Sequence, residues 1–215
     1  MFVKSIMIPK NASITVGKSE PLNAALTKMN ENHLEGLPVL NGKRYVGIIT
    51  RFGIYEAFFQ SDSAKNIFLE NSTVEELTTH QNQYLNGVEI FENTLLDLKD
   101  FPLLAVVGED REFLGIVTRF DVLEQFQSAF GTNRSGVRIA ITSVEAEGRI
   151  ARLSNLAIQY HQDIISLVTF DETDKLVRRI VVKVAKNEQT DKFFHKLEES
   201  GFRILHIYDD QLVKK

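Results

Sequence analysis

The feature that most constrains this chain is an internal repeat. The stretch YVGIITRFGIYEAF, residues 45–58, returns 68 residues later as FLGIVTRFDVLEQF, residues 113–126, with seven of the fourteen positions identical. Duplication at a fixed spacing points to one supersecondary unit that is used twice. At one repeated position the first copy has Gly53 and the second has Asp121. The duplicated unit therefore carries a carboxylate in one copy only.

The residues around each copy predict the elements of the unit. In both copies an apolar run, a polar turn and a second apolar run lead into the shared Thr-Arg-Phe, and this pattern predicts a β-hairpin, with Asn41-Gly42 as a strong turn signal in the first copy. Apolar residues at helical spacing come before and after each hairpin. Neither unit is long enough to bury its sheet alone, so we expect the two units to pack on each other.

The motif G-h-h-T-x-x-D (h is apolar), preceded by an apolar strand of the LPV type, resembles the CBS domain. Its tandem occurrence is similar to a CBS pair, or Bateman module. The resemblance covers residues 1–128, with unit one at about 1–60 and unit two at about 61–128. It implies that the two units form one ligand-binding module.

The rest of the chain has a different pattern. Residues 137–215 read as strand, helix, a hairpin around the turn 171–175, a second helix that stops at Gly201, and a last strand. The order βαββαβ is that of ferredoxin-like domains. The stretch EAEGRIARLSNLAIQYHQDIISL resembles an ACT domain. With residues 129–136 as a linker, the prediction is an α+β chain with a CBS pair and an ACT-like domain.

The polar end of each repeated strand suits a phosphate or a ribose. A strand that turns into a helix leaves free backbone N–H groups, beside which a threonine hydroxyl adds a donor and an acceptor. Arg51 and Arg119 can contact phosphate, and Asp121 can accept hydrogen bonds from ribose hydroxyls. The apolar strands before them offer a flat slot for a purine. The alternative is that these threonine and aspartate side chains are ordinary helix caps, and the two roles are compatible.

The CBS resemblance implies an adenosine-type ligand on Thr118 and Asp121, together with the strand before the first helix of a unit. Gly53 leaves the first copy without the carboxylate, so its site is expected to be empty, weaker or adapted. Tyr84 is expected to stack on a base. The candidate nucleotide-binding residues are Thr15, Leu37, Pro38, Val39, Thr50, Arg51, Tyr84, Ala105, Val106, Val107, Thr118, Arg119 and Asp121.

The ACT resemblance marks Glu147, Gly148 and Arg149 as a candidate effector turn, because that family often places an amino-acid effector there. The simpler interpretation is a glycine-containing loop that starts a helix, and it is preferred here. The C-terminal domain is then expected mainly to dimerise through its sheet edge or its helices.

Several classes of function find no support in the sequence. The chain of 215 residues has no cysteine, so it has neither a disulfide framework nor a thiolate site. Its five histidines lack the spacing of a local metal pair, and phosphate-loop, nucleophile-elbow and Rossmann motifs are missing. The net charge of -4 gives neither half a marked basic surplus, which argues against nucleic acid. We expect no membrane span, no resident cofactor or metal, no catalysis, and a cytoplasmic location.

The predicted function is that of a regulatory sensor. Occupancy of the CBS pair by an adenine nucleotide would be read by the ACT-like domain or by an unidentified protein partner, in a homodimer. The combination resembles the AcuB-like proteins associated with acetoin utilisation and the cyclic di-AMP-binding CBS proteins of Gram-positive bacteria. The ligands to consider are cyclic di-AMP and AMP, ADP or ATP, then S-adenosylmethionine. The alternatives are a structural interaction module without a nucleotide, an accessory protein of acetoin utilisation, and an enzyme subunit.

Overall fold

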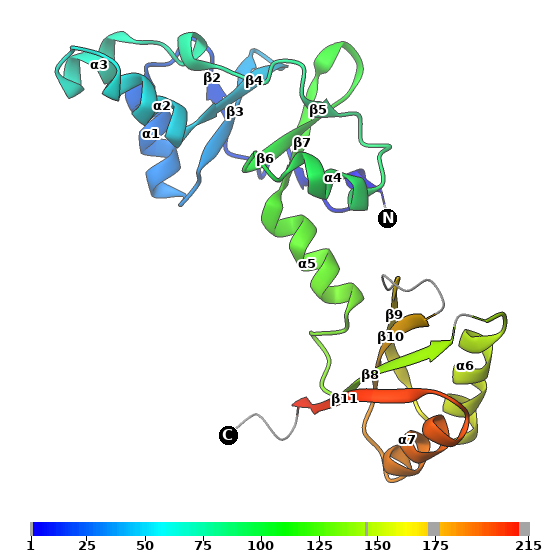
Figure 1. Cartoon of the computed structure of the whole chain (residues 1–215). Coiled ribbons are helices and arrows are strands. Elements are labelled where there is room, and N and C mark those ends of the chain that lie inside the picture. The colour runs from blue at the N-terminus through cyan, green and yellow to red at the C-terminus, as the bar shows by residue number, and fades with distance from the viewer. Residues whose placement is uncertain (1, 145, 172–176, 211–215) are drawn as a thin grey trace. The chain divides into compact units, whose positions relative to one another are not determined.

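The chain divides into two units in a computed structural model, one running to Glu124 and the other starting at Gln125 (Figure 1). The structure describes residues 2–144, 146–171 and 177–210. The division falls within one helix, α5 (Arg119–Ala129). Both units combine helices with strands, so the fold is mixed α+β, as the sequence predicts.

The N-terminal unit contains the two repeats and two small sheets. The sheet of the first repeat has the order β2-β3-β4, and that of the second has the order β1-β7-β6-β5. Both predicted hairpins are present, and Gly42 makes the first turn with φ +63°. The elements are η1 (Val3–Ser5), β1 (Ile8–Pro9), β2 (Val16–Gly17), α1 (Leu22–Glu31), β3 (Gly36–Asn41), β4 (Arg44–Thr50), α2 (Arg51–Phe59), α3 (Lys65–Asn71), η2 (Val74–Leu77), β5 (Tyr84–Leu85), α4 (Phe91–Asp97), β6 (Leu103–Val107), η3 (Glu109–Arg111) and β7 (Phe113–Thr118).

The N-terminal part of each unit pairs with the sheet of the other unit. Strand β1, in unit one, pairs with β7 of unit two, where Ile8 is opposite Ile116. Thr79, in unit two, forms a bridge to Ile48 of unit one. The expectation that the two units pack on each other is confirmed by this exchange.

The exchange explains the glycine of the repeated motif. Gly47 and Gly115 occupy the same position in the two copies, and a Cβ atom at either would collide with the backbone of the crossing segment, at Thr79 and Ile8 respectively. Only a residue without a side chain lets two backbones approach so closely. The glycine of the motif is therefore required by packing between the repeats.

Between the repeats lies a shared apolar cluster. Tyr45 and Ile48 of the first repeat pack there with side chains from β6 and β7 of the second. Tyr45 is fully buried, and its single hydroxyl proton is shared between the backbone carbonyl oxygens of His80 and Gln83, 3.3 and 3.2 Å away. Burial raises the pKa of Tyr45 far above its ordinary value. The repeats are thus joined by a core as well as by strand exchange.

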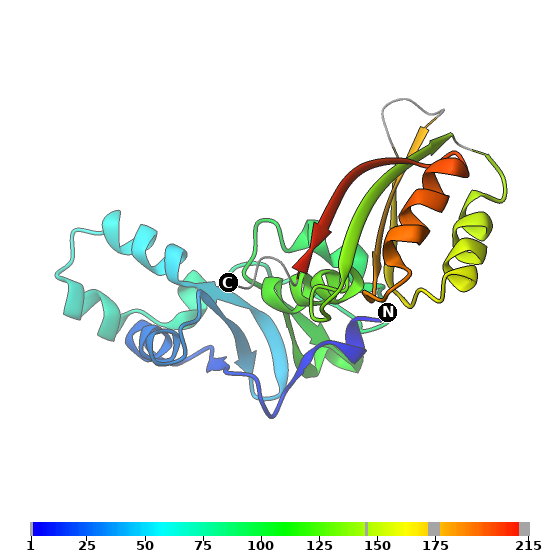
Figure 2. The same cartoon turned by 90° about the horizontal axis from the view of Figure 1, so that it is seen from below.

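The C-terminal unit has one antiparallel sheet with two helices on one face (Figures 1 and 2). The apolar face of the sheet packs against these helices through a cluster that includes Ile139, Val182, Leu153 and Phe193. The strand order is β11-β8-β10-β9. The elements are β8 (Val137–Val144), α6 (Arg149–Gln159), β9 (Ile164–Asp171), β10 (Val177–Val184), α7 (Thr190–Glu199) and β11 (Arg203–Asp209).

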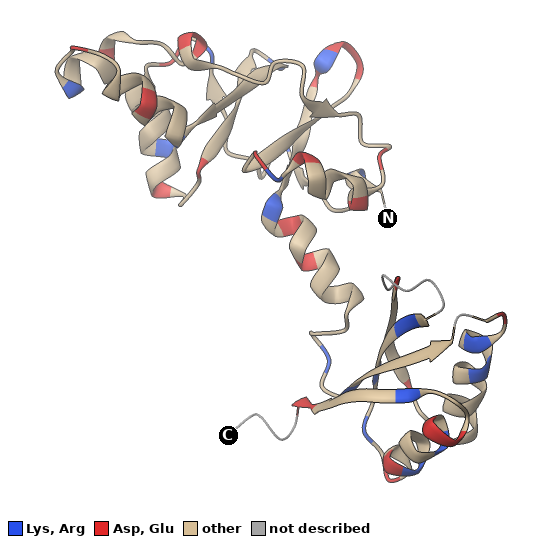
Figure 3. Ribbon diagram, viewed as in Figure 1, with Lys and Arg blue, Asp and Glu red and all other residues tan. Residues whose placement is uncertain are grey.

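The order of elements in this unit is the predicted βαββαβ. Gly201, with φ +84°, follows the end of α7 as the sequence predicts. Of the predicted hairpin turn 171–175, residues 172–175 lie outside the described residues. Within the described ranges, no helix combines the length and the apolar character that a membrane crossing requires. Figure 3 shows Lys and Arg interspersed with Asp and Glu in each unit.

Candidate functional site

The junction between β7 and α5 is held by Thr118 and Asp121. The Asp121 carboxylate accepts from the backbone N–H of Thr118 at 2.8 Å and from its hydroxyl at 2.6 Å, and the N–H of Asp121 points back at that hydroxyl at 3.2 Å. This reciprocal arrangement is a capping box, in which Thr118 is the N-cap. One carboxylate oxygen of Asp121, Oδ1, has no hydrogen-bond partner among the described residues. Capping therefore leaves Asp121 with an oxygen for a ligand.

The equivalent junction of the first repeat keeps only half of this arrangement. The Thr50 hydroxyl accepts from the backbone N–H of Gly53 at 3.0 Å, so Thr50 also caps its helix, α2. Gly53 supplies no carboxylate to accept from Thr50 in return. The two copies thus share a cap and differ in the acceptor that a ribose requires.

Arg51 and Arg119 occupy the same position in the two repeats and make the same kind of contact. Arg119 donates to the backbone carbonyl oxygens of Leu98, Lys99 and Phe101 at 3.0–3.2 Å. Arg51 donates to the carbonyl oxygen of Leu34 at 2.8 Å and also contacts Asn30. Both guanidinium groups tie down the loop that follows the preceding helix. Their predicted contact with phosphate would have to coexist with these bonds.

The strands predicted as a purine slot lie in the core. Leu37 and Val39 of β3 belong to the core of the first repeat, while Ala105 and Val107 of β6 belong to the cluster between the repeats. Pro38 and Val106 are also buried. Because these side chains are buried, a base could contact only the ends of these strands.

The two other predicted contact residues lie on or beside short strands. Thr15 precedes β2, and its carbonyl oxygen accepts from the Lys28 ammonium at 3.1 Å. Tyr84 of β5 packs edge-on against Tyr45, with the Arg111 guanidinium 5.3 Å from the centre of its ring. A base stacking on Tyr84 would therefore compete with a cation–π contact.

A cleft of about 410 Å³ opens between the two repeats. Thr118 and Arg119 line the cleft from the second repeat. Residues 33–36, which lead into β3, line it from the first repeat. Apolar side chains dominate its walls, among them the exposed Phe120 and Leu123 of α5. The full lining is Ile14, His33, Leu34, Glu35, Gly36, Pro102, Leu103, Ile116, Thr118, Arg119, Phe120 and Leu123.

Of these lining residues, the sequence predicted only Thr118 and Arg119, although the repeat pattern indicates others. Residues 33–36 and 101–104 are separated by the same 68 residues as the repeated motif, and both stretches contribute to the cleft. Polarity could not mark them, because Leu34, Pro102 and Leu103 resemble ordinary core residues. Equivalent positions from two repeats are expected to face each other across a pseudo-two-fold axis.

His80 lies beside the loop that Arg119 holds. Its ring meets the Phe101 ring at 4.1 Å between centroids, and its Nδ1 is 2.6 Å from the Thr79 hydroxyl. Partial burial lowers the pKa of His80, since desolvation disfavours the imidazolium. This histidine is a neutral packing group at neutral pH.

In the C-terminal unit, the predicted effector turn begins α6. Gly148 has φ +80°, and the Arg149 guanidinium donates to the Gly201 carbonyl oxygen at 2.6 Å while lying 4.4 Å from the centre of the Phe202 ring. A small pocket of about 200 Å³ includes Gly148 and Arg149, but not Glu147. Arg149 thereby fixes the start of α6 to the end of α7.

Comparison with known proteins identifies the fold of the repeats. Residues 3–59 match the family model of the CBS domain. The first repeat is a CBS domain. A crystal structure of a CBS domain-containing protein from Bacillus anthracis is 26% identical with a TM-score of 0.53, and the match covers 59% of this chain and 93% of that one. That share exceeds the span of residues 3–59, so the likeness extends beyond the first repeat.

Two further proteins are similar to this chain. CbpB of Listeria monocytogenes, in complex with cyclic di-AMP, is 27% identical over 56% of this chain and 91% of that one, with a TM-score of 0.50. An inosine-5'-monophosphate dehydrogenase of Korarchaeum cryptofilum is 28% identical over 146 residues, which are 67% of this chain. The match spans only 29% of that enzyme's length.

Proposed function

We propose that this protein is a non-catalytic sensor whose CBS pair binds an adenine nucleotide, cyclic di-AMP or AMP, ADP or ATP. The observation that carries the proposal is the cleft between the repeats, with Thr118 on its wall; Asp121 does not line the cleft but is hydrogen-bonded to Thr118. The likeness to CbpB, which binds cyclic di-AMP, supports the choice of ligand. The ligand would regulate the protein, with no bond made or broken.

In this proposal Asp121 holds the ribose. Its Oδ2 is fixed by two bonds from Thr118, and its Oδ1 accepts from a ribose hydroxyl. The apolar walls, including Ile14 and Pro102, shelter the base from water. Gly53 leaves the first repeat without this acceptor, so a dinucleotide would be held unequally by the two copies.

The signal would arise from packing between the repeats. The cleft is lined by both repeats, so a ligand that fits one arrangement of them better than another shifts the population toward it. The C-terminal unit, which we propose to be an ACT-like domain, or a protein partner would read that shift. The size of the response is limited by the difference in affinity between the two arrangements.

A homodimer in the cytoplasm is part of the same proposal. Helix α2 exposes Phe52, Tyr55 and Phe59, and α5 exposes Phe120 and Leu123 at positions equivalent to the first two. Residues at i, i+3 and i+7 share one helical face, and an exposed apolar face of this kind favours self-association.

Calorimetric titration with cyclic di-AMP, AMP, ATP and S-adenosylmethionine tests the sensor. A ligand at 100 times its Kd should stabilise the folded protein by about 2.7 kcal/mol. Asp121→Ala and Thr118→Ala should weaken binding, whereas Thr50→Ala, which removes the equivalent cap of the first repeat, is the matched control. If no adenine compound binds, the sensor proposal is wrong. If Asp121→Ala and Thr118→Ala both leave the affinity unchanged, the ligand binds elsewhere on the protein.

One observation favours a second function. The Thr118 hydroxyl and both arginines of the motif are already engaged within the protein. This is what a purely structural module, built to present a surface to a partner, would require. Such a module predicts no heat of binding with any of the four compounds.

A further inference from the structure

The open face of the C-terminal sheet carries a row of polar residues directly opposite one another. Tyr208 of β11 pairs with Arg138 of β8, and Arg138 pairs with Lys183 of β10. Lys183 in turn pairs with Ser166 of β9. Residues paired in this way project from the same face of a sheet, so the row crosses all four strands on the side away from α6 and α7.

Two cations meet in the middle of this row with only one carboxylate. Lys183 is 6% exposed, lies 2.6 Å from the Asp210 carboxylate and donates to the Gly131 carbonyl oxygen at 3.0 Å. The Arg138 guanidinium makes no hydrogen bond or ion pair with any residue in the described ranges. Like charges directly opposite each other in a sheet are destabilising. The row therefore has an excess positive charge that lacks a counterion within the described protein.

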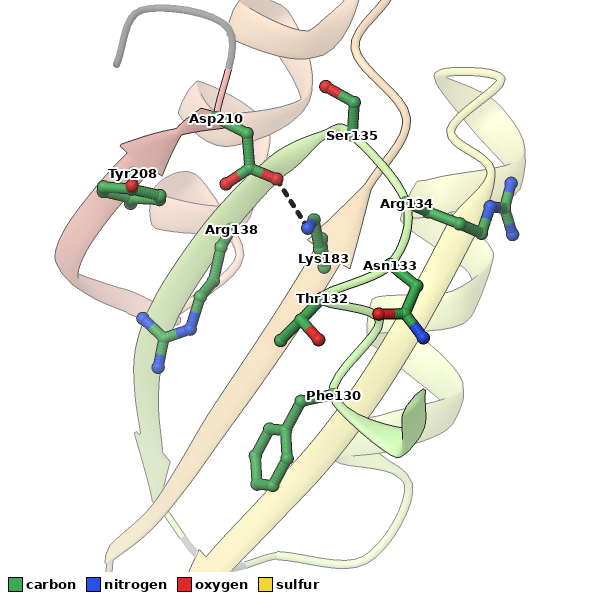
Figure 4. Close-up of a pocket in the computed structure, with 9 residues that line it drawn as sticks. All are labelled: Phe130, Thr132, Asn133, Arg134, Ser135, Arg138, Lys183, Tyr208 and Asp210. Carbon is green, nitrogen blue, oxygen red and sulfur yellow. Dashed lines mark ion pairs between the residues drawn. The ribbon is translucent and has the colours of Figure 1, made fainter. Parts of the chain in front are cut away.

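Tyr208, Arg138 and Lys183 of this row line a pocket of about 470 Å³ (Figure 4). Residues 130–135 cross the open face and form a wall, with the Phe130 ring stacked on Phe170 of β9 at 6.2 Å. Arg134 is turned away from Lys183 in Figure 4 and pairs with Asp163 at 2.9 Å. Among the three cations of the lining, Arg138 is the one left for an occupant.

We propose that this pocket binds a small organic oxyanion, a carboxylate or phosphate group attached to a flat ring. The Arg138 guanidinium donates to the oxyanion and relieves the charge excess beside Lys183. Tyr208 on one edge strand and Phe130 over the other edge strand flank Arg138, so a ring on the ligand gains aromatic contacts. The volume suits one small molecule.

The pocket wall also gives the occupant a route to affect the rest of the chain. Residues 130–135 follow α5 directly in the sequence, and Phe130 and Gly131 are already fixed to β9 and β10 by hydrogen bonds from Ser166 and Lys183. A ligand against this wall restrains the segment that follows α5. This site is independent of the nucleotide site proposed in the CBS pair.

The test uses four probes with the full chain: inorganic phosphate, acetate, phenyl phosphate and phenylacetate, each at an ionic strength matched with sodium chloride. Calorimetry or NMR titration is expected to show saturable binding, tighter for the probe with a ring than for its head group alone. If phosphate and phenyl phosphate bind more tightly than acetate and phenylacetate, the preferred head group is a phosphate. The reverse order of affinities identifies a carboxylate. If no probe saturates beyond the chloride control, the proposal is overturned.

Two arginine substitutions separate binding from folding. Arg138→Gln should weaken the best probe about tenfold or more, because a charge-assisted hydrogen bond is lost, whereas Arg134→Gln should change its affinity by less than about twofold. Arg138→Lys should retain part of the affinity. Without a probe, Arg138→Gln should melt no lower than the unsubstituted protein, since a cation opposite Lys183 is gone. A lower melting temperature, or equal effects of the two glutamine variants, would refute the proposal.

Discussion

Replacing Asp121 with glycine makes the second strand-to-helix junction equivalent to the first. The substitution removes the two hydrogen bonds from Thr118, at 2.8 and 2.6 Å, and the negative charge in the first turn of α5. The lost hydrogen bonds cost about 1 kcal/mol, the first-turn charge about 0.5 kcal/mol, and the lower helix propensity of glycine about 0.3 kcal/mol. The expected loss is about 2 kcal/mol in the free energy of unfolding.

The reverse substitution, Gly53→Asp, should work in the opposite direction. Glycine at this position is helical, and a Cβ there would lie 3.2 Å from the Thr50 hydroxyl oxygen, a contact that a small shift relieves. The new carboxylate can accept from Thr50 as Asp121 accepts from Thr118. Because part of the gain is spent on that shift, we expect a stabilisation of about 1 kcal/mol.

Urea unfolding gives both free energies, and amide hydrogen exchange of residues 51–59 and 119–129 assigns each change to its helix. The same variants should change nucleotide binding: Asp121→Gly should weaken it, as Asp121→Ala should, and Gly53→Asp should add a second ribose acceptor, seen as higher stoichiometry. If Asp121→Gly costs less than about 0.5 kcal/mol, the capping box contributes little and the argument fails. If Asp121→Gly leaves the affinity for the nucleotide unchanged, Asp121 stabilises the helix and does not bind the ligand.

Three further outcomes are expected. Gly115→Ala should destabilise the N-terminal unit by about 3 kcal/mol or more in urea unfolding, because its Cβ collides with the crossing backbone at Ile8, whereas Gly53→Ala should cost far less. The lowered pKa of His80 means that the unfolded chain binds a proton more readily, so stability should fall as pH drops below about 6.5, and His80→Asn should reduce that slope in melting curves. Phe59→Ser, at a side chain that is 91% exposed, should reduce self-association in sedimentation without lowering stability.

The sequence predicted those parts of the fold that depend on local pattern. The hairpins follow from apolar runs around a turn such as Asn41-Gly42, and the βαββαβ order follows from alternating periodicities. The exchange of segments was not predictable, because β1 has two residues and no pattern of its own. The exchange requires Gly47 and Gly115, and both glycines are visible in the sequence. A single sequence, however, does not show which segment packs against a glycine.

The site was harder to predict because residue type does not reveal what a side chain contacts. Arg51 and Arg119 suit phosphate by their chemistry, yet each lies against backbone carbonyl oxygens of a loop that comes earlier in the chain. Tyr84 suits a base, yet Arg111 reaches its ring from the next hairpin. The sequence predicted that Asp121 binds a ribose. It did not show that hydrogen bonds from Thr118 hold this carboxylate in place.

The exchange of segments sets an order of events when the chain is made. Residue 8 cannot find its partner, residue 116, until both repeats have left the ribosome, which takes roughly five to twenty seconds at ordinary rates of synthesis. Until then β7 does not exist, and β1 has no strand to pair with. Contacts so distant in sequence make folding slow. A chain interrupted after the first repeat would leave β4 with an unpaired edge, open to aggregation or to a chaperone.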